Sequence, residues 1–567
     1  MTALVKKIKN GRAYWYATES ARVDGQPRVV RQRYLGTVEA IEAAFDAAYE
    51  PESIDVVEFG ATAAMWALAG RINFGLCIDA LLGPQATGLS VGTYLQAAAV
   101  NRAVAPTSKR GFVTYYDQSV LHRILPAPSQ AWASQRFWDA MHRVEPSLVE
   151  AIEEAYVKTA MDEFGIDAEA LVYDATNFHT HISSTNDKAP IAQRGHAKNR
   201  RFDLRLVGLA LACSTDHRIP LGHIATAGNA PDPKVFAAAL PKLVARLEAV
   251  GVDPASVTVV FDKGNNSETN LAEVDAASIG FVGSLVPSQH HDLLAVPDEE
   301  YQAVEDLEGV VAHRCERQIY GVTRSIVVTR SQNFLAKQLV GLAQTRGRVE
   351  VHLAELDRLL AGGRHKMDRA KLEARVAEAL APRWMSRLYR YGITGESKDD
   401  LALSWSFDEE AFALLKSTEL GKRIIFTDRL GWSTKQIVVA YRSQWEVEAA
   451  FRQMKDHEHA AFRPIYHWTD QKIRVHALYS VASLVLVNLA WREADRAGMG
   501  LSPNEVMEAL AAIQETTLIY PPAKGNGRPR ILRKLTRMDQ TQQELFKLYG
   551  LDAFSPREGT TAKWHGI

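Results

Sequence analysis

The chain contains 567 residues, more than one hydrophobic core usually serves, so we expect roughly two to four domains. Hydrophobic residues make up 47% and charged residues 23%, as in an ordinary soluble globular protein. The three cysteines (Cys77, Cys213 and Cys315) lie far apart, which argues against a disulfide framework or a zinc knuckle and suits a reducing cytoplasm.

The N-terminal third divides into two predicted parts. Residues 1–40 form a β-rich segment, because Tyr14, Tyr16 and Val29 are strand formers and Asp24-Gly25 is typical of a hairpin turn. Residues 41–167 form a mainly helical domain, because their alanine-rich runs carry apolar residues at helical spacing. No apolar run follows the basic N-terminus, so we expect no secretory signal.

From residue 168 the pattern changes to strands that alternate with helices. Residues 170–176, 204–214, 219–227, 257–261 and 280–285 are apolar runs of strand length, and a helix is expected over about 233–249. Two of the runs end in an acid, Asp174 and Asp262. This order favours a mixed α/β core, whose first part covers residues 168–289.

Residues 290–437 then interrupt the core as an insertion domain of short strands and a charged helical stretch at about 349–381. The core resumes over 438–495 with an amphipathic helix at 438–460 and a long apolar helix at about 472–492. The apolar run at 477–491 is too short to span a bilayer, so we expect a buried helix and no membrane partner. The C-terminal region, 496–567, is expected to be irregular from residue 519.

Acids at the ends of apolar strands can carry phosphodiester chemistry. An isolated carboxylate there is unfavourable unless it is paired or binds a cation, and clustered carboxylates hold hard divalent cations. A turn or capping aspartate is the alternative for Asp174 or Asp262 taken singly. A third segment, 441–455, supplies the further carboxylate, Glu448, which makes a three-acid set.

On a helix, four polar residues of that segment share one face, within roughly 60° of one another. They are Tyr441, Gln444, Glu448 and Lys455. Glu446 is a rival for Glu448 but points about 200° away, so both cannot face the same cations. Spacing to Tyr441 and Lys455 favours Glu448, and the donors of this face, with Arg452, suit a phosphate backbone. An ordinary surface helix is the alternative.

The net charge of −1 does not favour a nucleic-acid partner, but local positive field decides such binding. Three segments supply it: residues 6–33, 194–205 (with Lys198 and Arg201) and 524–537. Any one basic run is more often a solvated face; three of them beside a nuclease-like set of acids favour DNA.

These residues together resemble the bacterial insertion-sequence DDE transposases. The segment 441–455 matches their Tyr-x2-Arg-x3-Glu-x6-Lys signature with its spacing intact, except that Gln444 stands where the family has Arg. Tyr173-Asp174-Ala-Thr176 resembles their first Asp motif, and Val260-Phe261-Asp262-x-Gly264 their second. The resemblance covers about 170–495 well and the N-terminal part loosely.

The resemblance implies a ribonuclease H-like catalytic core with an insertion domain before the catalytic Glu, and Mg2+ (or Mn2+) held by Asp174, Asp262 and Glu448. It implies cleavage at terminal inverted repeats and joining of the 3′-OH ends to target DNA, by a homodimer in the DNA complex, in the cytoplasm at the nucleoid. DNA contacts would come from Tyr441, Gln444, Lys455, Arg452, Lys198 and Arg201, and the helical domain 41–167 would bind the repeats. A catalytically inactive DNA-binding descendant and a nuclease without strand transfer remain alternatives.

Overall fold

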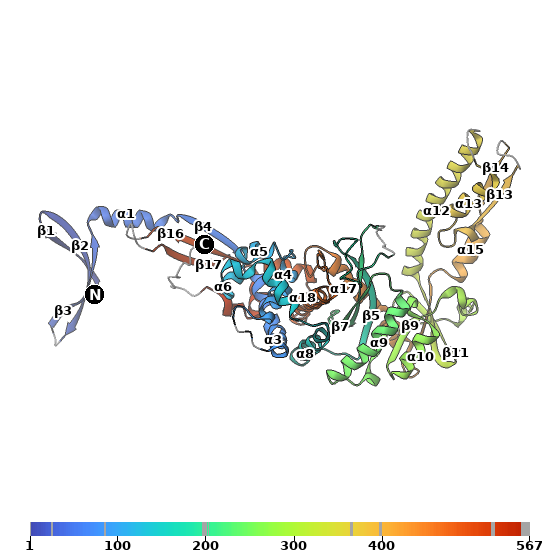
Figure 1. The fold of residues 1–567 in the computed structure, drawn as a ribbon, viewed down its shortest axis with the longest axis horizontal. Helices are drawn as coiled ribbons and strands as arrows, with labels where there is room; N and C mark the ends of the chain where they lie inside the picture. Colours follow the sequence, from blue (N-terminus) through green and yellow to red (C-terminus); the bar gives the residue numbers. More distant parts are fainter. Residues whose placement is uncertain are drawn as a thin grey trace. The chain divides into compact units, whose positions relative to one another are not determined.

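The computed structural model, whose fold is shown in Figure 1, divides the chain into two compact units. Unit 1 comprises residues 1–163 and 453–567, and unit 2 comprises residues 164–452. The structure describes residues 2–23, 26–83, 85, 87–195, 201, 203–362, 367–395, 400–522 and 528–556. The expected turn at Asp24-Gly25 lies outside these residues.

Unit 2 is built on a nine-stranded mixed sheet with strand order β10-β11-β12-β15-β9-β8-β5-β6-β7. Its strands are β5 (Ala170–His179), β6 (Leu206–Ser214), β7 (Pro220–Ala227), β8 (Thr258–Val260), β9 (Gly280–Ser284), β10 (Gln302–Ala303), β11 (Val310–Ile319), β12 (Val322–Ser331) and β15 (Lys422–Thr427). β5 runs parallel to β8, and β8 runs parallel to β9, whereas the other pairs are antiparallel. The predicted mixed α/β fold is therefore confirmed.

One face of the central strands is lined by aromatic rings. The ring of Phe236, on α9 (Asp232–Ala249), lies 5.1 Å from that of Tyr173 and 4.9 Å from that of Phe261, measured between ring centroids. Phe261 stacks on Phe281 at 5.7 Å, and Phe281 meets Phe426 at 5.0 Å. Because strand side chains alternate between faces, Asp174 and Asp262, which follow Tyr173 and Phe261, project from the opposite face. α10 (Glu268–Ala276) packs beside α9.

Between β12 and β15 the chain leaves the sheet and builds a separate hydrophobic cluster. It consists of α12 (Gln332–Ala361), α13 (Arg369–Ala379), α14 (Met385–Leu388), the hairpin β13 (Tyr389–Thr394) and β14 (Ala402–Phe407), and α15 (Glu409–Thr418). Leu353, Leu372 and Met385 are completely buried in this cluster. At its base the Ser331 amide donates to the Gly421 carbonyl at 2.9 Å, which closes the excursion where it began.

The end of unit 2 carries α16 (Thr434–Arg442) and α17 (Gln444–Lys455). A single helix over 438–460 was predicted, and this prediction is wrong because Ser443 ends α16. α16 ends at Arg442 and α17 begins at Gln444, with Ser443 between them. α17 ends in unit 1.

Unit 1 has a helical core with a long apolar helix, α18 (Asp470–Arg496), at its centre. Around α18 pack α2 (Gly60–Arg71), α4 (Val91–Val104), α7 (Ser134–His142), α19 (Pro503–Ala511) and α20 (Gln540–Leu548). By length and composition α18 could cross a membrane, but 94% of its apolar window is buried inside the protein. The predicted buried helix is confirmed.

The rest of unit 1 comprises two small antiparallel sheets and shorter helices. The first sheet is β1 (Thr2–Lys9), β2 (Arg12–Val23) and β3 (Gln26–Gly36), and the second is β17 (Arg530–Leu535), β16 (Gln514–Tyr520) and β4 (Ser53–Glu58). The helices are α1 (Val38–Tyr49), α3 (Phe74–Leu82), α5 (Phe112–Gln118), α6 (Leu121–Ile124) and α8 (Pro146–Phe164). The prediction of an irregular chain from residue 519 is wrong, because β17 pairs with β16 and α20 follows.

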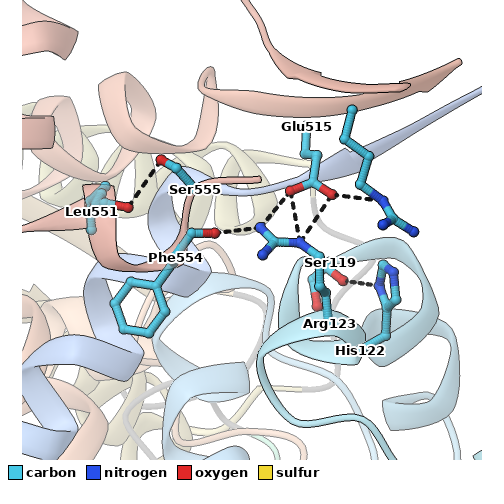
Figure 2. Close-up of polar contacts among 8 residues, drawn as sticks. Ser119, His122, Arg123, Glu515, Leu551, Phe554 and Ser555 are labelled. Carbon is cyan, nitrogen blue, oxygen red and sulfur yellow. Dashed lines mark hydrogen bonds and ion pairs between the residues drawn. The ribbon is translucent and has the colours of Figure 1, made fainter. Parts of the chain in front are cut away.

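A buried carboxylate joins the second sheet to the helical part of unit 1 (Figure 2). Glu515, on β16, is only 1% exposed and accepts two bonds from Arg123 Nε at 3.0 and 3.1 Å. Arg533 on β17 lies 3.5 Å from the same carboxylate. A second nitrogen of Arg123 donates to the Phe554 carbonyl, so one arginine ties α6, β16 and the C-terminal turn together.

Candidate active site

The two aspartates predicted to hold metal lie at matching positions on neighbouring parallel strands. In the β5–β8 pair, Val172 is the partner of Val260. Asp174 and Asp262 each lie two residues farther along, and the backbone at Asp262 is still extended, with φ −79° and ψ 159°. Because residues two apart share a face, both carboxylates leave the same face of the sheet, from strands spaced about 4.8 Å apart.

Ser284 on β9 continues this row by one strand. Val260 pairs with Val282, so Ser284 matches Asp262 in register. The Tyr441 hydroxyl donates to the Ser284 hydroxyl at 3.0 Å. Tyr441 is 5% exposed; burial raises the pKa of its phenol, and the Asp262 carboxylate also contributes to raising it. α16 therefore lies on the face of the sheet from which the aspartates project, close to Asp262.

The start of α17 contacts the same face on the other side of the aspartates. Cys213 on β6 is the partner of Val172, so its thiol lies on this face. Burial raises the pKa of that thiol, and the charges of Arg218 and Glu446 act on it as well. The Glu446 carboxylate lies 3.7 Å from Arg218 Nε. α16 and α17 thus extend from β9 to β6, across the strands that bear Asp174 and Asp262.

Glu448 projects from this helix and is exposed. It lies two residues beyond Glu446, about 200° around the helix, so it points away from the Arg218 pair. In the part of the chain that the structure describes, no three His, Cys, Asp or Glu side chains lie close enough to hold a metal ion. The donor set itself fits a hard divalent cation, because carboxylate oxygens are the preferred ligands and two of the three are register-matched.

The predicted DNA-contacting residues have different environments. Gln444 is half-buried, while Arg452 and Lys455 are exposed. Arg201 is exposed but forms an ion pair with Asp203 at 2.8 Å. Lys198 lies outside the described residues. The Tyr441 hydroxyl is directed to Ser284 within the protein, and its contact with DNA stays a prediction.

Sequence reasoning missed two residues of this region, Ser284 and Arg218. Ser284 could have been found, because it ends an apolar strand as Asp262 does. Arg218 lies in the β6–β7 turn with a left-handed backbone (φ 48°), and its guanidinium lies 5.6 Å from the ring centre of Trp445. Nothing in the sequence pattern singles out this arginine.

A protein-family model matches part of the chain. Residues 166–381 match the model of the transposase DDE domain, a stretch that includes Asp174 and Asp262 and ends before Glu448. This match supports a DDE transposase. Among solved structures, a piggyBac transposase in a synaptic complex with hairpin DNA aligns with a TM-score of 0.36 and 7% identity, over 80% of this chain and 78% of that chain. No curated protein matches.

Proposed function

We propose, starting from the match of residues 166–381 to the transposase DDE domain, that this protein is the transposase of an insertion sequence. It binds the terminal inverted repeats, cleaves the DNA at their ends and joins the freed 3′-OH groups to target DNA. The observation that carries this proposal is the register match of Asp174 with Asp262 on adjacent parallel strands, inside the residues that match the family.

The order of elements supports a ribonuclease H-like core. β5, β6 and β7 come first, followed by α9, β8, α10 and β9. β5 and β8, the strands that lead to the two aspartates, lie side by side near the middle of the sheet. This is the arrangement in which two acids on central strands share a metal site, and a helix brings the third acid.

In this proposal Asp174, Asp262 and Glu448 hold the divalent cations, Mg2+ or Mn2+. Bound cations would lower the pKa of the attacking hydroxyl and stabilise the leaving oxygen. Glu448 is exposed on α17, which follows the helix that contacts Ser284, and in this proposal it supplies the third carboxylate. Arg452 and Lys455 on the same helix would neutralise DNA phosphates, and Gln444 would donate without charge.

The proposal is tested with purified protein, the DNA that flanks the gene, and Mg2+. Asp174→Ala, Asp262→Ala and Glu448→Ala should each abolish cleavage and joining. Asp232→Asn is the matched control, because Asp232 is exposed at the start of α9, whose Phe236 packs on Tyr173 on the opposite face of the sheet. EDTA should stop the reaction, and Mg2+ or Mn2+ should restore it.

Each alternative gives a distinct result in the same assay. If all three variants cleave like the wild type, the acids do not form the active site and the proposal is wrong. Cut ends without joined products would indicate a nuclease without strand transfer. Binding of the repeats without cleavage by the wild type would indicate a catalytically inactive DNA-binding protein. A crosslinked dimer on paired ends is expected for the active complex.

A further inference from the structure

The N-terminal sheet, β1 to β3, presents an unusually large exposed surface for its size. Every residue of β1 is exposed, and so is nearly all of β3. Apolar side chains are among them, with Leu4 65% and Ile8 71% exposed. α1 packs against β2 and β3. A sheet this open, on a chain proposed to act on DNA, calls for a binding partner.

Positive charge is concentrated on the two outer strands of this sheet. β1 carries Lys6, Lys7 and Lys9, β3 carries Arg28, Arg31 and Arg33, and neither strand contains an acid. The middle strand has no lysine or arginine between Arg12 and Arg22. All six outer side chains are exposed. The sheet thus has two basic edge strands and a middle strand that carries both signs of charge, with Glu19 opposite Arg31.

This charge distribution fits the major groove of duplex DNA. Two interstrand spacings separate β1 from β3, about 10 Å, and the major groove is about 12 Å wide. Phosphates line both walls of the groove, so each basic edge would face one wall. β-ribbons are known to enter this groove.

The two faces of the sheet differ, because Arg31 and Arg33 pair with Glu19 and Ala17 on one face, whereas Tyr16, Gln32 and Tyr34 lie on the other face and would meet the floor of the groove. Cross-strand pairing places Tyr16 opposite Tyr34, and their ring centres are 5.2 Å apart. Lys7 lies 4.9 Å above the Tyr16 ring and donates to the Gln32 amide oxygen at 3.2 Å. Tyr34 is 55% exposed. Phenol and amide groups donate and accept hydrogen bonds, as base edges require.

Other partners fit less well. Lysines and arginines along both edge strands oppose pairing with an edge strand of a second copy, which would align like charges. Double-stranded RNA has a deep, narrow major groove that does not admit a sheet. We propose that the sheet β1–β3 is a DNA-binding module that lies in the major groove of duplex DNA, with β1 and β3 on the two phosphate walls. The proposal rests on the proposed function only in that the ligand is DNA.

The test uses the full-length protein, EDTA, and a fluorescent 30-base-pair DNA duplex of arbitrary sequence, with binding measured by anisotropy over a range of KCl. The variant Lys6→Gln, Arg31→Gln, Arg33→Gln removes three exposed charges from the two edges. The slope of log affinity against log salt should become shallower by about 2 to 3, since each lost phosphate contact contributes about 0.9. The Kd at moderate salt should rise at least about tenfold.

Two further variants separate charge from folding. The control Lys158→Gln, Lys234→Gln, Lys547→Gln removes three exposed charges from α8, α9 and α20 and should leave the salt slope nearly unchanged. Lys6→Arg, Arg31→Lys, Arg33→Lys keeps the charges and should bind like the wild type. A 30-base-pair RNA duplex should compete poorly.

The inference is overturned if the edge variant binds as tightly, and with the same salt slope, as the control variant. It is also overturned if RNA duplex competes equally well, or if the edge variant changes only the oligomeric state in sedimentation. Because binding is measured in EDTA, the outcome does not depend on cleavage. If the sheet does not bind DNA, the proposed chemistry of Asp174, Asp262 and Glu448 is unaffected. If substitution of these acids does not affect cleavage, the result of the binding test is equally unaffected.

Discussion

The Tyr441 hydroxyl donates to the Ser284 hydroxyl at 3.0 Å, and Ser284 occupies the position on β9 that Asp262 occupies after β8. One hydrogen bond thus fixes the helix that precedes Glu448 to the row of residues that contains both aspartates. The bond is buried, so its loss has a measurable effect.

Tyr441→Phe removes this bond and leaves the ring in place. We expect the free energy of unfolding to fall by about 1 kcal/mol, because the buried Ser284 hydroxyl loses its partner. Cleavage should slow while the Kd for DNA stays constant. Urea unfolding, anisotropy and a cleavage time course measure the three quantities. Tyr391→Phe, at a 46% exposed tyrosine, is the control. Weaker DNA binding at unchanged stability would instead show that the Tyr441 hydroxyl contacts DNA.

Glu446 and Glu448 should respond differently to the same substitution. Glu446 is 13% exposed and faces Arg218, and burial raises the pKa of its carboxyl. Glu446→Gln should lower the free energy of unfolding by about 2 kcal/mol, because Arg218 loses its counter-charge. The folded variant should still cleave DNA.

Glu448→Gln should have the reverse profile, abolishing cleavage with little change in stability, because the side chain is exposed. Melting temperature and cleavage rate, measured on both variants, decide between the two glutamates. If Glu446→Gln alone abolished cleavage, Glu446 would be the third acid.

A buried histidine pair in unit 1 predicts a loss of stability in acid. His476 Nε2 donates to the Phe462 carbonyl at 2.7 Å, and its Nδ1 lies 3.0 Å from His467 Nε2. Burial, above all, holds the pKa of each imidazole well below 6.5; the cations Lys109 and Arg102 add to this effect on both rings.

Below pH 6.5 the two histidines are protonated in the unfolded chain but stay neutral in the folded protein. The free energy of unfolding therefore falls as the pH falls. The slope should approach about 2.7 kcal/mol per pH unit for two histidines. Urea unfolding between pH 8 and 5 measures it. His467→Gln should halve this contribution, whereas His142→Gln, at an exposed histidine, should leave the slope unchanged. Equal slopes in all three proteins would exclude the pair as the source.

Glu515→Gln should destabilise unit 1 strongly. The carboxylate is 1% exposed, accepts from Arg123 and lies near Arg533, so its neutralisation leaves two arginine charges without their partner (Figure 2). We expect the free energy of unfolding to fall by about 3–5 kcal/mol. Glu508→Gln, at an exposed position on α19, should change it by less than about 0.5 kcal/mol. Similar melting curves for the two variants would contradict the structural role of Glu515.

The strands that lead to the aspartates could be predicted because their signal is local. An apolar run of strand length that leads to an acid is visible without any partner, and the runs before Asp174 and Asp262 became β5 and β8. Only Asp262 follows the end of its strand, since β5 continues five residues beyond Asp174 to His179. Their adjacency was implied only by the resemblance to a family with a ribonuclease H-like core. The break at Ser443 was missed because the amphipathic spacing continues through it from α16 into α17.

Pairings between distant segments could not be predicted. β16 pairs with β4, so Glu515 lies opposite Val57, more than 450 positions earlier in the chain. β15 pairs with β9 and brings the chain back beside Asp262 before α16 begins. The placement of Glu448 depends on two such contacts, Tyr441 with Ser284 and Glu446 with Arg218. Neither contact leaves a repeating pattern in the sequence from which it could be predicted. The division into functional domains and the metal ligands stay predictions.

The excursion between β12 and β15 is topologically a hairpin loop. Its two ends pair in one antiparallel ladder, with Arg330 opposite Lys422, and the Ser331 amide donates a hydrogen bond to the Gly421 carbonyl across them. The excursion therefore constrains the sheet only through the distance between the ends of β12 and β15. A tight two-residue turn could replace residues 332–420 without moving either aspartate. We therefore expect this point of the fold to tolerate changes of length, so that residues 332–420 could be exchanged or removed while the sheet keeps its structure.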